Sequence, residues 1–381
     1  MIIANGILFC DDGVFRKTDI EIESGIIKAI GKGASGVQEV IDAKGKYIIP
    51  GLVDIHIHGC AGADFCDASP ESIATMARFL VSRGTTSFLG TSLTLPQATL
   101  IDIFSTAKSM MDKHAPDAAI LRGINMEGPF FNPEKRGAQN KDYIADPNFD
   151  KFSELNKVSG GNIKTVAIAP EMPNGLDFIK KARGITNISL AHSAASYDIA
   201  KAAFDAGACH VTHIFNGMSP FGHRDPGIVG AAADSNATVE LICDGHHVHP
   251  SAVRAVFAMF GNDKVCLISD AMTACGMPDG RYILGGQNVI VAKGAAMLEG
   301  GNTLAGSVAT LFDCLKNVVK FGISLDVAVK AATINPAKAM GIDKHVGSLT
   351  KGKQADVLIL NKDLSLEKVI IKGDTVSKSF N

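Results

Sequence analysis

The stretch Asp54-Ile55-His56-Ile57-His58-Gly59 joins an apolar strand to a pair of histidines, and seven further apolar runs follow it along the chain. Side chains two residues apart on a strand point to the same face, so both imidazoles are expected to project together. The predicted strands are Val53–His58, Thr86–Thr91, Ile120–Glu127, Val166–Ala169, Ile188–His192, His210–His213, Val239–Cys243 and Val265–Asp270. Helical segments separate them, for example between the start signal Ser69-Pro70-Glu71 and the stop signal Gly84. Eight such units predict a closed, TIM-like (β/α)₈ barrel, with an open doubly wound sheet as the alternative.

Both ends of the chain differ from this pattern. Residues 1–49 and 343–381 contain short runs that alternate apolar and polar side chains, such as Asp19-Ile20-Glu21-Ile22-Glu23. This alternation is typical of antiparallel strands with one exposed face. Each end is too small to fold alone, so we expect the two to pair into one β-rich domain. The remaining residues, 50–342, are predicted to form the barrel domain.

Composition excludes several classes of protein. The chain has 381 residues, of which 46% are hydrophobic and 20% are charged, so it can bury a core. Its formal net charge of −2, the absence of tryptophan and only 6% aromatic residues argue against a nucleic-acid or membrane partner. The eight cysteines form no Cys-x-x-Cys pair, and the N-terminus lacks the basic region of a signal peptide. We therefore expect a soluble, cytoplasmic protein without disulfides.

One glycine pattern is discounted. Gly31, Gly33 and Gly36 match the spacing of the dinucleotide-binding fingerprint, but no convincing helix follows them. We interpret this segment as a loop.

Ionisable side chains recur where the predicted strands end. The group consists of His56, His58, Glu127, His192, His213 and Asp270. A single such residue is usually a cap or a solvated loop residue, but all C-terminal strand ends of a barrel open onto one face. Six imidazoles and carboxylates gathered there would repel one another or remain poorly solvated without a shared cation. The set therefore predicts a divalent metal site, and its nitrogen and oxygen donors suit zinc or iron(II).

The loops after the sixth and seventh predicted strands suggest an anionic substrate. The first contains Asn216, Gly217 and Arg224, and the second contains His247. The planar guanidinium of arginine suits phosphate, and a nearby histidine can add a charge-assisted hydrogen bond. The alternative is a surface arginine paired with Asp225 and a solvated histidine tract.

The stretches PGLVDIHIHG, INMEGPFFN, LAHS, THIFNGM followed by HRDPG, CDGHHV, LISDAM and TLAGS resemble N-acetylglucosamine-6-phosphate deacetylases of the amidohydrolase superfamily. The resemblance implies a metal-dependent barrel with a small β-sandwich built from both chain ends, assembled as a homodimer. It implies that Glu127, His192 and His213 bind metal and that Asp270 is the catalytic acid and base. The implied substrate contacts are Ala138, Gln139, Asn216, Gly217, Arg224, His247, Leu304, Ala305 and Gly306. In this family the arginine can reach the phosphate of the neighbouring subunit's substrate.

The sequence departs from the family pattern at two places. Position 139 is Gln where many relatives carry His, although Gln can still donate a hydrogen bond. His56 and His58 are both present, whereas some members lack this pair and use one metal. A second metal bound by His56 and His58 and bridged by Glu127 is therefore a hypothesis. We expect one or two divalent cations per subunit, with Zn, Fe, Mn and Co all acceptable to these donors.

The function expected from these residues is hydrolysis of the N-acetyl group of N-acetylglucosamine 6-phosphate. N-acetylgalactosamine 6-phosphate is the alternative substrate, since no residue visibly reads the configuration of one hydroxyl. Cyclic-amide hydrolases are disfavoured because many use a carbamylated lysine at the end of the fourth strand, whereas Lys164 lies at its start. Barrel relatives that act as scaffolds have lost their metal ligands, and this chain keeps them.

Overall fold

The computed structural model describes residues 1–31, 39–111, 113 and 115–376. The loop interpretation of the glycine pattern at Gly31, Gly33 and Gly36 falls mostly outside the described residues.

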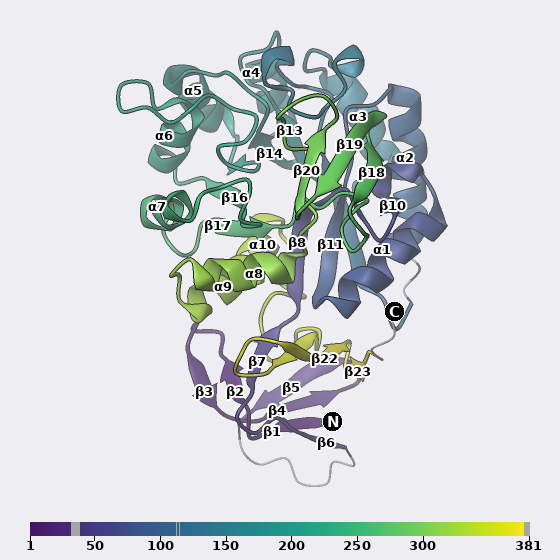
Figure 1. Cartoon of the computed structure of the whole chain (residues 1–381), viewed down its shortest axis with the longest axis vertical. Coiled ribbons are helices and arrows are strands. Elements are labelled where there is room, and N and C mark those ends of the chain that lie inside the picture. The colour runs from purple at the N-terminus through teal and green to yellow at the C-terminus, as the bar shows by residue number, and fades with distance from the viewer. Residues whose placement is uncertain (32–38, 112, 114, 377–381) are drawn as a thin grey trace.

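Eight parallel strands form the predicted barrel (Figure 1). They are β8 (Leu52–Ile57), β11 (Thr85–Thr91), β12 (Ile120–Met126), β13 (Ile163–Ile168), β14 (Asn187–Leu190), β15 (His210–Val211), β16 (Thr238–Ile242) and β17 (Val265–Ile268). Each pairs with its neighbour in chain order, from β8 to β17. The first and last strands also meet, because Ile57 bridges Ala271 and the Asp270 amide donates to the His56 carbonyl at 3.0 Å. The sheet is thus closed, and the open alternative is wrong.

Helices surround the barrel. They are α1 (Pro70–Ser82), α2 (Gln97–Met111), α3 (Phe149–Val158), α4 (Gly175–Ala182), α5 (Tyr197–Ala206), α6 (Gly227–Asp234), α7 (Pro250–Phe260), α8 (Leu311–Lys320), α9 (Leu325–Ala332) and α10 (Ile334–Ala339). Short 3₁₀ turns occur at Phe65–Asp67, Pro133–Lys135 and Lys141–Tyr143. The predicted start signal acts as a cap, since the Ser69 side chain accepts from the Ser72 amide ahead of Pro70.

The chain ends together form a two-sheet lobe below the barrel (Figure 1). One sheet has the order β5-β4-β1-β6 and the other β23-β22-β21-β7-β2-β3. The strands are β1 (Ile2–Ala4), β2 (Ile7–Phe9), β3 (Phe15–Lys17), β4 (Ile20–Glu23), β5 (Ile26–Ile30), β6 (Val40–Asp42), β7 (Tyr47–Pro50), β21 (Val357–Leu360), β22 (Leu366–Ile371) and β23 (Asp374–Thr375). Successive side chains of β21 point alternately to the two faces of its sheet. Val357 and Ile359 pack in the core between the two sheets of the lobe, whereas Leu358 and Leu360 pack with the barrel core. The division into residues 1–49 with 343–381 and residues 50–342 stays a prediction.

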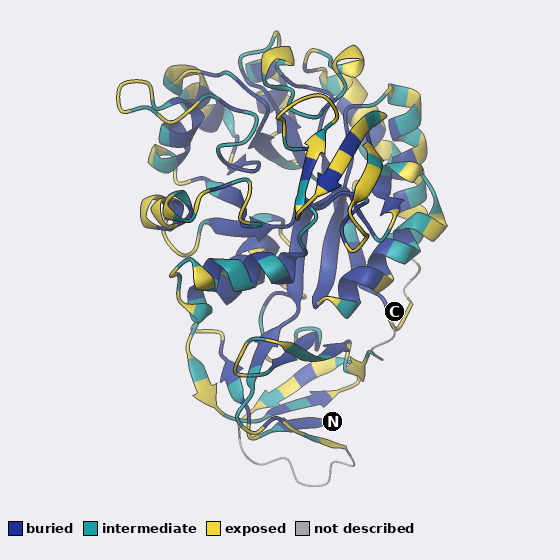
Figure 2. Cartoon of the chain, viewed as in Figure 1, coloured by how far each residue is buried: buried dark blue, intermediate teal, exposed yellow. Residues whose placement is uncertain are grey.

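A small antiparallel sheet, which was not predicted from the sequence, follows the last barrel strand. Its strands are β18 (Gly280–Leu284), β19 (Gln287–Ala292) and β20 (Ala295–Leu298). Burial alternates along β19, and Val289 and Val291 pack in one cluster with Leu93 and Met272 (Figure 2). A further two-stranded ribbon, β9 (Gly59–Cys60) with β10 (Ala63–Asp64), follows β8.

Two expectations concern the whole chain. All eight cysteines are unpaired in the structure. In the described part of the chain, no helix has both the length and the apolar character that crossing a bilayer requires.

Candidate metal centre

The predicted ligands gather at the C-terminal ends of the barrel strands. His56 lies in β8, and His58 directly follows that strand. Glu127 directly follows β12. The other three each lie two residues beyond a strand: His192 after β14, His213 after β15 and Asp270 after β17. All six residues are buried. The last three have φ values of 44°, 25° and 48°, in the left-handed region that non-glycine residues seldom adopt. Such backbone conformations are found preferentially at functional sites, and here they occur together.

One donor group consists of Glu127, His192 and His213. The Glu127 Oε1 atom lies 3.2 Å from His192 Nε2 and 3.0 Å from His213 Nε2, and the two ring nitrogens are 3.2 Å apart. Three donor atoms from three strand ends thus face one point.

A second group consists of His56, His58 and the same Glu127. The His58 Nε2 atom lies 3.3 Å from both Glu127 Oε2 and Asp270 Oδ1. The His56 Nε2 atom lies 3.6 Å from Glu127 Oε1 and 3.5 Å from Asp270 Oδ1. Within each group the candidate ligand atoms lie within 4.8 Å of one another. Glu127 therefore connects the two groups, as the bridging hypothesis requires.

The charges of these side chains depend on one another. Burial disfavours the ionised Glu127, but the charge of His56 and hydrogen bonds from His192 and His213 hold its pKa well below 4.5. Burial also opposes ionisation of Asp270, and His58 and His56 lower its pKa below 3.8. Burial disfavours the cationic His56, yet Glu240 and Glu127 raise its pKa to about 9. The centre thus pairs ionised carboxylates with a histidine whose pKa is raised.

The donor set fits a divalent cation. The His56 Nε2 atom, which faces Glu127 and Asp270, is buried without a hydrogen-bond partner among the described residues. His58 and His192 direct Nδ1 to main-chain carbonyls, of Thr91 at 3.3 Å and Lys135 at 2.8 Å, so their Nε2 atoms face the carboxylates. Imidazole nitrogen with carboxylate oxygen is a common ligand set for zinc and other divalent first-row metals.

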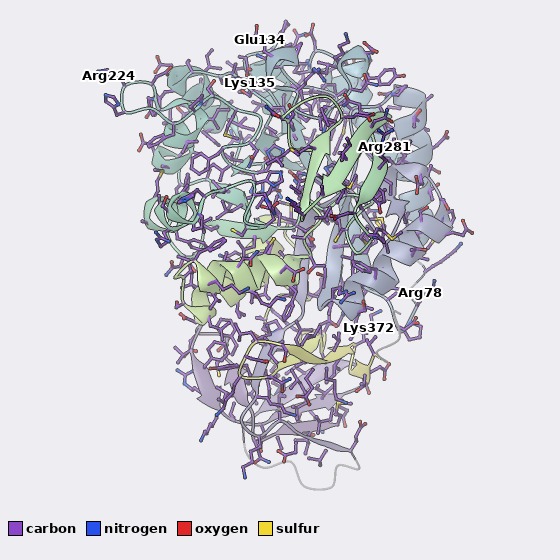
Figure 3. All side chains as sticks on the ribbon, in the orientation of Figure 1. Arg78, Glu134, Lys135, Arg224, Arg281 and Lys372 are labelled. Carbon is purple, nitrogen blue, oxygen red and sulfur yellow. The ribbon has the colours of Figure 1, made fainter. Side chains whose placement is uncertain are left out.

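A cavity of about 240 Å³ opens above the centre. Seven of the nine predicted substrate contacts line it: Ala138, Gln139, Asn216, Gly217, His247, Leu304 and Gly306. Ala305 is fully buried and pairs with β20 through its amide, which donates to the Ala296 carbonyl at 3.0 Å. Arg224 is exposed at the outer tip of the loop before α6, away from the cavity of its own chain (Figure 3). The cavity wall also includes Asn302 and Thr303, which were not predicted from the sequence.

Gln139 contacts the centre itself. Its Nε2 atom donates to Glu127 Oε2 at 2.7 Å, and its Oε1 atom accepts the Thr94 amide at 2.8 Å. The side chain is therefore held between a main-chain donor and the shared carboxylate.

Two buried residues beside the centre were missed from the sequence: Glu240 in β16, which contacts His56, and His210 in β15, which contacts Glu240. Glu240 is fully buried, and its Oε2 atom lies 2.9 Å from His56 Nδ1, while its Oε1 atom lies 3.2 Å from His210 Nε2. Burial opposes its ionisation, but these two histidines lower its pKa to about 2. A carboxylate in the middle of the apolar run Val239–Cys243 was the available signal.

Comparison with known proteins agrees with this centre. The chain belongs to the amidohydrolase family, whose model matches residues 47–376. It is 38% identical over 334 residues to the N-acetylglucosamine-6-phosphate deacetylase of Vibrio furnissii, covering 86% of this chain and 82% of that protein. It is 34% identical to the N-acetylgalactosamine-6-phosphate deacetylase of Escherichia coli O157:H7, covering 97% of both. A mutant N-acetyl-D-glucosamine-6-phosphate deacetylase of Mycobacterium smegmatis, solved in complex with N-acetyl-D-glucosamine-6-phosphate, superposes with a TM-score of 0.92 at 31% identity over 99% of both chains. The predicted family resemblance is confirmed.

Proposed function

We propose that this chain hydrolyses the acetamide of N-acetylglucosamine 6-phosphate to glucosamine 6-phosphate and acetate. The observation that carries the proposal is the pair of donor groups sharing Glu127 at the floor of the 240 Å³ cavity. The similarity to deacetylases along nearly the whole chain supports the choice of substrate.

Glu127, His192 and His213 would hold one divalent cation, and His56, His58 and Glu127 a second. A cation bound in such a site lowers the pKa of its water from 15.7 to about 7 and polarises a carbonyl oxygen. Zn, Fe, Mn and Co all accept these donors.

Asp270 would act as general base and then general acid. Its carboxylate lies at the cavity floor, and its lowered pKa keeps it ionised and ready to accept a proton from the attacking water. The same proton can then pass to the sugar nitrogen as the C–N bond breaks, which turns a poor leaving group into a neutral amine.

Recognition of the phosphate would involve His247 and Arg224. The His247 ring is fixed by Asp244, whose Oδ2 atom lies 2.7 Å from Nδ1, so its Nε2 atom remains for a ligand. Because Arg224 lies outside its own cavity, we propose that the chain forms a homodimer in which Arg224 reaches the neighbour's substrate. Eight unpaired cysteines support a cytoplasmic location.

The galactosamine epimer is a second candidate because the Escherichia coli N-acetylgalactosamine-6-phosphate deacetylase matches over 97% of both chains. A cyclic amide is a poorer candidate, since Lys164 is the second residue of β13, at the end of the strand away from the donor groups.

Acetate release from four substrates tests the proposal: the two N-acetylhexosamine 6-phosphates and the two unphosphorylated sugars. The proposal predicts the highest kcat/KM for N-acetylglucosamine 6-phosphate and a large loss without the phosphate. Preference for the galactosamine epimer would assign the alternative, and no acetate from any of them would reject deacetylation.

A further inference from the structure

Glu240 is a carboxylate in the interior of the barrel with no exposed surface. Burying an ionised carboxylate is unfavourable unless its oxygens are paired, so the partners of Glu240 indicate its role. One oxygen, Oε1, lies 3.2 Å from His210 Nε2. The other, Oε2, lies 2.9 Å from His56 Nδ1 and accepts the His213 amide at 3.2 Å. The group of His56, His58 and Glu127 is therefore linked to Glu240 through the His56 ring. The group of Glu127, His192 and His213 is linked to it through the main-chain amide of His213.

The contact with His56 determines which ring nitrogen is available. A neutral imidazole carries its proton on one nitrogen and a lone pair on the other. When a cation takes the place of the Nε2 proton, the carboxylate at Nδ1 keeps the remaining proton there, so the lone pair lies on Nε2, which faces Glu127 and Asp270. The Nδ1 atoms of His58 and His192 instead face main-chain carbonyls, which are weaker acceptors. The His56 ring is thus oriented by a charged acceptor, whereas the His58 and His192 rings are oriented by neutral ones.

We propose that Glu240 is a positioning residue that fixes the His56 ring for a second cation held with His58 and Glu127. This inference rests on the proposed function only in that the two donor groups bind metal. It predicts that Glu240 affects the second group selectively, because its hydrogen bond with the first comes from a main-chain amide, which a neutral acceptor can also satisfy.

The test compares Glu240→Gln with a matched control, His210→Gln. The control changes the partner of the other carboxylate oxygen and leaves the His56 contact in place. Protein stripped with a chelator is titrated with Co²⁺, and binding is followed by equilibrium dialysis and by the visible absorption of bound cobalt. Unfolding curves of all forms are recorded alongside.

We expect two Co²⁺ per wild-type chain. In Glu240→Gln the first should bind within about threefold of the wild-type affinity, whereas the second should weaken by about 10- to 100-fold, the range for losing such an outer partner. In His210→Gln both should bind as in wild type. One ion per wild-type chain at saturation, equal weakening of both ions in Glu240→Gln, or equal effects of the two substitutions would overturn the inference.

If Glu240→Gln does not fold, the wild type still provides a test. Nitrogen-15 histidine spectra of the zinc-loaded protein should show a proton on His56 Nδ1 and metal on Nε2, and the reverse arrangement would reject the proposal. Acetate release by the same wild-type sample reports on the proposed function separately. If the wild type releases acetate but Glu240→Gln binds the second Co²⁺ with wild-type affinity, this inference is contradicted and the proposed function is not.

Discussion

At the scale of single residues, the centre depends on where the chain turns as it leaves each strand. His192, His213 and Asp270 leave their strands in the left-handed conformation, which directs three side chains toward Glu127 and His56. The left-handed conformation costs a non-glycine residue about 1 kcal/mol or more, so contacts with the surrounding barrel must hold each residue in it. The geometry is thus preorganised by the fold, before any ligand arrives.

Asp270→Asn tests the acid–base assignment. The amide matches the carboxylate in shape but cannot take up a proton, so kcat should fall at least about a hundredfold. Metal content should remain as in wild type, because Glu127 and the imidazoles make up both donor groups. Near-normal turnover in a metal-replete Asp270→Asn sample would remove Asp270 from this role.

Most of the centre could be predicted from residue type and spacing. His56 and His58 are marked by their period of two, and Glu127, His192 and Asp270 by ending apolar runs. The role of Glu240 could not be predicted because it depends on which side chains lie next to it in the closed barrel. Its partner His56 is 184 positions away in the sequence. Gln139 was predicted as a substrate contact, and its additional hydrogen bond to Glu127 could not be predicted from the sequence.

At the scale of elements, the segment between β20 and α8 forms one wall of the cavity and supports Asp270. The Ser307 amide donates to the Asp270 carbonyl at 2.7 Å, and the Met272 amide donates to the Ser307 carbonyl at 3.0 Å. Gly306 has a φ of 64°, and a Cβ added to it would lie 3.0 Å from the Asp270 carbonyl oxygen. Glycine is therefore needed here both for its conformation and for the close approach.

Gly306→Ala should lower kcat/KM by about tenfold or more, since a displaced catalytic group loses its alignment. Gly300→Ala is the matched control, because Gly300 also has a positive φ of 79° but no atom within 4 Å of the added Cβ. Steady-state kinetics on N-acetylglucosamine 6-phosphate measure both. Equal effects of the two substitutions would attribute the loss to backbone strain alone and contradict the role of this contact.

The strands and helices of the barrel could be predicted from the local pattern of apolar residues, whereas the β18–β20 sheet could not. Its strands have four to six residues and expose Ile283, Ile290 and Met297, so they lack a clean apolar face. Of their packing partners, Met272 lies in the connection from β17 to β18, whereas Leu93 lies in the loop after β11, far away in the sequence. Only the closed barrel brings these loops together.

At the scale of the whole molecule, the lobe and the barrel are joined by apolar packing and by polar contacts at the bottom of the barrel. Arg122 of β12 donates from Nη2 to Gln354 Oε1 at 2.9 Å and from Nε to Ser87 Oγ at 3.2 Å. The lobe therefore supports the barrel at the end opposite the metal centre. Arg224, by contrast, is exposed on the outside of the barrel, at the tip of the loop before α6.

Mixing two inactive variants tests whether Arg224 acts across a dimer. Arg224→Ala and Asp270→Asn should each be nearly inactive on the phosphorylated sugar. After denaturation and refolding together, random dimers would regain about a quarter of the wild-type sites, because each mixed dimer carries one intact site. Activity no higher than the mean of the two variants would place Arg224 outside the neighbour's site.

The central claim is that the side chains around Glu127 hold the metal that makes hydrolysis possible. The most direct test is acetate release from N-acetylglucosamine 6-phosphate by chelator-stripped protein as Zn²⁺, Mn²⁺ or Co²⁺ is added back, with bound metal measured on the same samples. The account predicts no turnover in the stripped protein and a return of activity in step with occupancy of the Glu127, His192 and His213 group. Full turnover by a demonstrably metal-free sample would contradict it.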